Sequence, residues 1–181
     1  NLADFFRLNG ISYEALPIET NDEGKENLFA GRCDVYTTDA SGLSSTRAAA
    51  ADPSKWLVLP EIISKEPLGP LVRHGDHQWG DVVRWSLNAM IIAEELGITS
   101  ENVDASLGSN VPEVLRLLGV EGSYGEMLEL APDWAYQILK QIGNYSESYE
   151  ANVGPDTPLE IARGLNALWT QGGILYAPPF R

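Results

Sequence analysis

The sequence is poor in basic side chains. It contains 12 lysine and arginine residues against 26 aspartate and glutamate residues, which gives a formal net charge of −14. A surface with this balance repels a phosphate backbone, so we do not expect nucleic acid as a partner. The acidity suits a small zwitterionic or cationic ligand, but a solvated surface explains it at least as well.

Long apolar runs and paired cysteines are missing as well. A transmembrane helix needs roughly 20 apolar residues, and Asp81 and Arg84 interrupt the best helical candidate. We therefore predict no membrane span. The chain begins with Asn1 and lacks a signal-peptide pattern, so any export signal would have been removed or would lie upstream. The single Cys33 has no partner within the chain and is expected to be unpaired.

The signatures of common enzyme chemistries are also absent. There is no Gly-x-Ser-x-Gly elbow, Walker loop, Cys-x-x-Cys pair or glycine-rich dinucleotide fingerprint. His74 and His77 stand three apart, as two metal ligands on a helix would, but the Gly75-Asp76 between them predicts a turn. We expect neither a metal site nor a cofactor.

The first sixty residues contain alternating helix-like and strand-like segments. The predicted helices cover 2–10, 21–31 and 40–51, and the predicted strands cover 11–19, 33–39 and 56–63. This order is typical of an α/β unit with a mostly parallel sheet. Pro17 and Pro60 interrupt two of the strands and favour edge positions or bends.

The second half is predicted to be helix-rich. Residues 64–77 hold two prolines and two glycines around a short apolar core, as a crossing between two lobes would. A long amphipathic helix is predicted over 78–97, and shorter helices over 111–118, 133–143 and 158–170. Core packing is the expected role of the tryptophans at helical apolar spacing, which are Trp79, Trp85, Trp134 and Trp169.

Asp39 is the main candidate for a binding residue. It ends a predicted strand and opens a helix, which is where open α/β sheets place their ligands, and its carboxylate could hold an ammonium group. It could equally be the N-cap of that helix, since Asp is a favoured cap. Thr37 and Thr38 alternate faces, so one of them could line the same crevice. The residues themselves leave these alternatives open.

Three further charged side chains have plainer explanations. Arg47 could reach a ligand carboxylate only if its helix were turned toward the crevice, so we expect a solvated surface arginine. Lys65 and Glu66 lie in the crossing segment and are expected to be a solvated pair.

Several long segments resemble the general L-amino-acid-binding periplasmic proteins, which are ABC transporter solute receptors of the polar amino-acid class. These segments are GRCDVYTTDASGL, LPEIISKEPLGPLVRHGD, ILKQIGNY and NVGPDTPLEIARGLNALWTQGGILYAPPFR. The likeness extends from the first residues to Arg181.

The resemblance implies a type II periplasmic-binding-protein-like α/β fold with two lobes and a hinge crossing. Residues 1–66 would form part of lobe two, and residues 67–181 would form the hinge return, the C-terminal part of lobe one and added helices. Members of the family are nearly twice as long, so the resemblance implies an N-terminally incomplete chain. We expect such a chain to aggregate or swap when isolated.

The function that the resemblance implies is binding of L-amino acids in the periplasm of a Gram-negative bacterium, with delivery to the membrane subunits of an ABC importer. Asp39 would bind the ligand's α-ammonium group, with Thr38 and Thr37 beside it. The groups that bind the α-carboxylate, and a disulfide partner for Cys33, would lie upstream of Asn1. No enzyme activity is implied.

Two other classes remain as alternatives. A dehydratase for a small carboxylic acid could use the same two-lobed fold, with Asp39 or Glu66 as acid or base. A regulator's ligand-sensing domain would need a fused DNA-binding or membrane segment, and no such segment stands in the sequence.

Overall fold

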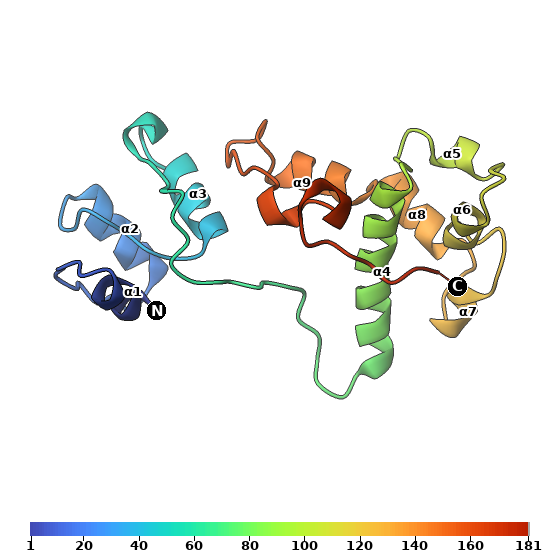
Figure 1. Ribbon diagram of the computed structural model, residues 1–181, viewed down its shortest axis with the longest axis horizontal. Helices are drawn as coiled ribbons and strands as arrows, with labels where there is room; N and C mark the ends of the chain where they lie inside the picture. The colour runs from blue at the N-terminus through green and yellow to red at the C-terminus, as the bar shows by residue number, and fades with distance from the viewer. Residues whose placement is uncertain (181) are drawn as a thin grey trace. The chain divides into compact units, whose positions relative to one another are not determined.

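The computed structural model describes residues 1–180 and divides the chain into two compact units (Figure 1). Unit 1 comprises Asn1–Gly69 and Pro158–Ile161, and unit 2 comprises Pro70–Thr157 and Ala162–Arg181. The change of unit after Gly69 falls in the segment 64–77, for which the sequence predicts a crossing. The assignment of these units to two lobes stays a prediction.

Unit 1 contains its three helices where the sequence predicts them. They are α1 (Leu2–Leu8), α2 (Asn21–Phe29) and α3 (Ala40–Ala48), followed by the 3₁₀ turn η1 (Pro53–Lys55). The start of α2 is set by Thr20, whose hydroxyl accepts the Glu23 amide at 3.2 Å. Just after its end, Gly31 takes a φ of 69°, a conformation that glycine adopts without steric cost.

The predicted strands of unit 1 are wrong for this chain. Residues 11–18 and 57–59 have no regular secondary structure, and within residues 1–180 the sole β-bridge joins Leu168 and Leu175 in unit 2. A strand needs a second backbone to complete its ladder, and no backbone hydrogen bond joins any two of the predicted strands.

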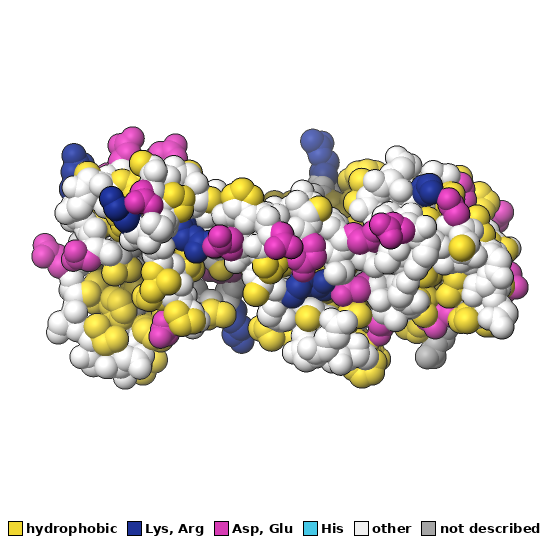
Figure 2. Space-filling view, turned by 90° about the horizontal axis from the view of Figure 1, so that it is seen from above, with side chains coloured by type: hydrophobic (Ala, Val, Ile, Leu, Met, Phe, Trp, Pro, Cys, Tyr) yellow, Lys and Arg dark blue, Asp and Glu magenta, His cyan; other side chains and the backbone are white. Residues whose placement is uncertain are grey.

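Apolar side chains of these segments remain exposed on unit 1. Figure 2 shows hydrophobic side chains gathered over the part that contains the N-terminal third of the chain. The exposed members include Ile11, Tyr13, Leu16, Val35, Leu57, Leu59 and Ile62. Open backbone groups beside apolar side chains favour association with another chain. Aggregation or swapping of the isolated chain stays a prediction.

Unit 2 is built around the long helix α4. Its helices are α4 (His77–Glu95), α5 (Val103–Ser106), α6 (Pro112–Leu117), α7 (Tyr124–Met127), α8 (Trp134–Gln141) and α9 (Tyr145–Asn152), followed by the 3₁₀ turns η2 (Gly164–Asn166) and η3 (Trp169–Gln171). The long helix predicted over 78–97 is confirmed, with Gly97 at a φ of 69° just after its end. Helices α8 and α9 both pack against α4 (Figure 1).

The buried core of unit 2 draws chiefly on α4, α5, α6 and α8 and on the segment after α9. It includes Ala89, Ile92, Val103, Leu117, Leu118, Trp134, Leu139, Leu168 and Phe180. Trp134 is buried and Trp85 packs partly buried against the core, as predicted. The prediction is wrong for Trp79 and Trp169, which are 55% and 51% exposed. Trp79 lies in the first turn of α4, and Trp169 stacks edge-on against Tyr176 near the surface.

The predicted helix over 158–170 is also wrong. Glu160 has a φ of 52° and Gly164 a φ of 48°, and this left-handed backbone interrupts any α-helix. Helix α9 was not predicted, although its start carries a recognisable signal. Asn144 and Glu147 form a capping box, in which each side chain accepts the other residue's amide.

Glu147 is partly buried and should stabilise unit 2 substantially. Its carboxylate accepts the Asn144 amide at 2.8 Å, and also the Ser100 amide at 3.1 Å and the Ser100 hydroxyl at 2.6 Å. We expect Glu147→Ala to lower the free energy of unfolding by about 2 kcal/mol, since a cap and a charged hydrogen bond are both lost. Urea unfolding followed by tryptophan fluorescence measures this, and equal losses in Glu147→Ala and the exposed control Glu150→Ala would contradict it.

Candidate functional site

Asp39 is the N-cap of α3. Its backbone is extended, with φ −61° and ψ 156°, and its carbonyl accepts the Leu43 amide at 2.9 Å. Its side-chain Oδ1 accepts the Gly42 amide at 2.9 Å and the Ser41 hydroxyl. The capping role that the sequence left open is therefore present.

The second carboxylate oxygen of Asp39 is much less engaged. Oδ2 accepts the Thr38 hydroxyl at 3.4 Å, which is long for an O–H···O bond. An ionised carboxylate has about four lone-pair sites, so Oδ2 keeps acceptor capacity after the cap is formed. The cap uses Oδ1, so it is compatible with the predicted ligand role, which stays a prediction.

The hydrogen bonds around Asp39 also set its charge state. The Ser41 hydroxyl, and after it the Gly42 amide, hold the pKa of Asp39 below the ordinary value of 3.8, against a smaller opposing effect of burial. The carboxylate is therefore ionised at neutral pH. A fixed negative charge with one open oxygen is what an ammonium group requires.

The two threonines before Asp39 differ in position. Thr38 is half-buried and its hydroxyl lies against Asp39, whereas Thr37 is exposed. The structure thus brings Thr38 and Asp39 together. A ligand contact for either threonine stays a prediction.

Arg47 is not the solvated side chain that the sequence predicts. Its Nη2 donates to Glu160 Oε2 at 2.7 Å and to the Leu159 carbonyl at 3.4 Å, and its side chain is 21% exposed. Both contacts lie within unit 1 and hold the segment 158–161 against α3. This engagement removes Arg47 as a candidate for a ligand carboxylate. Lys65 and Glu66 are exposed, as expected.

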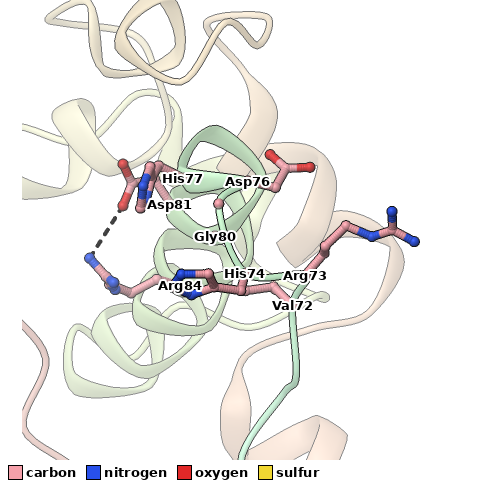
Figure 3. Close-up of a pocket in the computed structure, with 9 residues that line it drawn as sticks. Val72, Arg73, His74, Asp76, His77, Gly80, Asp81 and Arg84 are labelled. Atoms are coloured by element: carbon pink, nitrogen blue, oxygen red, sulfur yellow. Dashed lines mark hydrogen bonds and ion pairs between the residues drawn. The ribbon is translucent and has the colours of Figure 1, made fainter.

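The two histidines lie beside a shallow pocket of about 400 Å³ at the start of α4 (Figure 3). Asp76 there accepts the Trp79 amide at 3.1 Å, and Arg84 pairs with Asp81 at 3.2 Å. In Figure 3, Arg73 and Asp76 point away from His74. Within residues 1–180, no group of three or more His, Cys, Asp or Glu side chains could hold a metal ion.

Across residues 1–180, none of the helices is both long and apolar enough to cross a bilayer.

The whole chain is closely similar to curated amino-acid-binding proteins. No protein-family model matches it. It is 53% identical over 182 residues to the glutamate/glutamine/aspartate/asparagine-binding protein BztA of Rhodobacter capsulatus, and 52% identical over 183 residues to the general L-amino acid-binding periplasmic protein AapJ of Rhizobium johnstonii. These matches cover 100% of this chain and 54% of each relative. The chain thus spans about half the length of the curated relatives that it matches.

A solved structure agrees with these matches. An ABC transporter periplasmic binding protein from Brucella ovis, with glutathione bound, is 48% identical and superposes with a TM-score of 0.93. The match covers 99% of this chain and 57% of that protein. The resemblance predicted from the sequence is confirmed, and the chain has a fold like the corresponding part of a periplasmic binding protein.

Proposed function

We propose that this chain is part of a periplasmic solute receptor that binds L-amino acids and delivers them to the membrane subunits of an ABC importer. The observation that carries the proposal is its 53% identity, over all of its residues, to a protein named for binding glutamate, glutamine, aspartate and asparagine. The relatives are named as binding proteins and not as enzymes.

The ligand contact within this chain is Asp39. Its Oδ2 accepts a hydrogen bond from the ligand's α-ammonium group. Thr38, whose hydroxyl lies against this oxygen, completes the contact, and Thr37 lies next to it in the chain. The amino acids named for the relatives and the glutathione bound by the Brucella protein share a free α-ammonium group. A contact to that group accommodates them all, whereas selection among their side chains needs other residues.

The mechanism is lobe closure around the ligand. Unit 1 belongs to lobe two, and unit 2 to the hinge return and the C-terminal part of lobe one, with the rest of both lobes and the α-carboxylate site upstream. A ligand that contacts the closed form more strongly than the open form shifts the equilibrium toward closure. The importer then recognises the closed form.

The charge state of Asp39 argues against the dehydratase alternative. A general acid or base that works near neutral pH needs a carboxyl group with a raised pKa. The hydrogen bonds from Ser41 and Gly42 lower the pKa of Asp39 instead. A carboxylate that is ionised at neutral pH suits binding of a cation.

Calorimetric titration tests this function. Glutamate, glutamine, asparagine, leucine and glutathione are titrated into a form of the protein extended upstream to the relatives' length. We expect binding of several of them, weakened about 30-fold by Asp39→Asn, because a charged hydrogen bond contributes roughly 2 kcal/mol. Asparagine is also a favoured N-cap, so this substitution preserves the start of α3.

The control is Asp34→Asn, which removes an exposed charge from the same stretch of unit 1. It should bind like the unaltered protein. Absence of binding to every compound would reject the receptor proposal and lead to an assay of small carboxylic acids as dehydratase substrates. Binding that is unchanged in Asp39→Asn would leave Asp39 with capping alone.

A further inference from the structure

Gly42 occupies a helical position where alanine would be the better residue. It is the third residue of the nine-residue α3 and has no positive φ. A glycine within a helix costs about 1 kcal/mol relative to alanine, because it loses more backbone entropy on folding. Backbone conformation therefore does not account for this glycine.

The space around Gly42 gives a different reason for it. A Cβ added there would lie 2.9 Å from Asp39 Oδ2, 3.0 Å from Thr38 Cγ2 and 3.4 Å from Asp39 Cγ. The first distance is shorter than real Cβ atoms show, so a side chain at this position would force the carboxylate to move. The missing side chain thus leaves room beside the less engaged oxygen of Asp39.

The Asp39 carboxylate cannot rotate easily to accommodate a side chain at position 42. Its Oδ1 is held by the Gly42 amide at 2.9 Å and by the Ser41 hydroxyl. Two donors on one oxygen fix the orientation of the whole carboxylate plane. Oδ2 therefore points in a direction that Ser41 and Gly42 determine.

We propose that Ser41 and Gly42 are positioning residues for the ligand's ammonium group: they fix Asp39 through Oδ1 and keep the space beside Oδ2 free. This inference rests on the proposed function and adds to it the two residues that hold the binding oxygen in place. A purely capping role for Asp39 would need the Oδ1 bonds but would not need the space beside Oδ2.

The test measures stability and asparagine affinity in the upstream-extended protein. We expect Gly42→Ala to change the thermal midpoint little, because the helix propensity of alanine offsets the strained Asp39 cap, but to weaken asparagine binding at least tenfold. Ser45→Ala is the matched control, because Ser45 is exposed on the same helix. It should leave asparagine affinity unchanged and raise the thermal midpoint only slightly, because alanine favours the helix more than serine does.

The variant Ser41→Ala allows a second measurement, the pKa of Asp39, which a change in helix stability alone would not alter. Loss of the Ser41 hydroxyl should raise the pKa of Asp39 toward 3.8, measured by NMR titration of the side-chain carboxyl. Binding requires the ionised form and is lost as the pH falls through this pKa. The acid limb of the asparagine binding profile should therefore move to higher pH in Ser41→Ala, with affinity weakened severalfold and recovered in Ser41→Thr.

The outcomes separate this inference from the proposed function. If Asp39→Asn weakens binding while Gly42→Ala and Ser41→Ala bind like the unaltered protein, the positioning role is rejected and the receptor stands. If Asp39→Asn itself has no effect, the ammonium contact is rejected, and the positioning role with it. Should Gly42→Ala fail to fold, the affinity and acid limb of Ser41→Ala decide, and an unchanged result rejects the positioning role.

Discussion

Replacing Arg163 with alanine is expected to lower the free energy of unfolding of unit 2 by about 3 kcal/mol, because it strands a buried charge. Arg163 Nη2 donates to both carboxylate oxygens of Glu94, at 3.0 and 3.1 Å, and the two side chains are only 15% and 8% exposed. Nη2 also donates to the Asn166 carbonyl at 2.8 Å. The guanidinium lies 5.3 Å from the ring centres of Tyr145 and Tyr149. One side chain thus joins α4, α9 and the segment that follows Ala162.

Urea unfolding followed by tryptophan fluorescence measures the effect, since four of the five tryptophans lie in unit 2. Arg84→Ala is the control. Its pair with Asp81 is largely exposed, and such pairs contribute about 0–1 kcal/mol. The double variant Arg163→Ala with Glu94→Ala should lose less than the sum of the single losses, because the stranded carboxylate is gone. Additive losses would mean that the ion pair is not the source of the effect.

The helices of this chain were predictable where their signals are local. The starts of α2 and α3 carry capping residues, and the ends of α2 and α4 carry glycines that take a positive φ. These features involve residues three or four positions apart. The capping box of α9 is equally local, so the start of this helix is also predictable from its own residues.

The strands could not be predicted in the same way, because a strand depends on its neighbour. The residues of 11–19 favour an extended backbone by their own propensity. Whether that backbone pairs depends on a second segment in register, which the segment's own residues do not specify. In this chain no such pairing forms within residues 1–180 beyond the isolated bridge of unit 2.

The ion pairs within each unit could not be predicted from the sequence either, because their partners lie far apart in the chain. Arg163 pairs with Glu94, which lies 69 residues away in the sequence, and Arg47 pairs with Glu160, which lies 113 residues away. Periodicity places each residue on a helix or turn but does not identify its partner. Asp39 is the contrasting case. Both of its predicted roles follow from one position at the start of a helix, and only the geometry shows that its two oxygens can serve them separately.

Phe180 is expected to have the largest effect on stability of any single side chain considered. It is only 4% exposed, and its ring centre lies 5.1 Å from that of Tyr124 and 5.3 Å from that of Trp85. Its carbonyl accepts Arg116 Nε at 2.9 Å. We expect Phe180→Ala to cost about 4 kcal/mol, because the transfer free energy of the ring is lost and the cavity left behind cannot close fully.

The local surroundings explain why relaxation should be incomplete. A pocket of about 240 Å³ already lies beside the ring, between Trp85, Tyr124 and Leu128. The surrounding side chains do not fill this pocket now, so we do not expect them to fill the larger cavity that loss of the ring would leave. Tyr176→Ala is the control on the same tail, since Tyr176 is 73% exposed and should cost less than 1 kcal/mol. A loss in Phe180→Ala no larger than in Tyr176→Ala would mean that the tail leaves the core in solution. The aromatic cluster of Trp85, Tyr124 and Trp134 would then need another group to cover it.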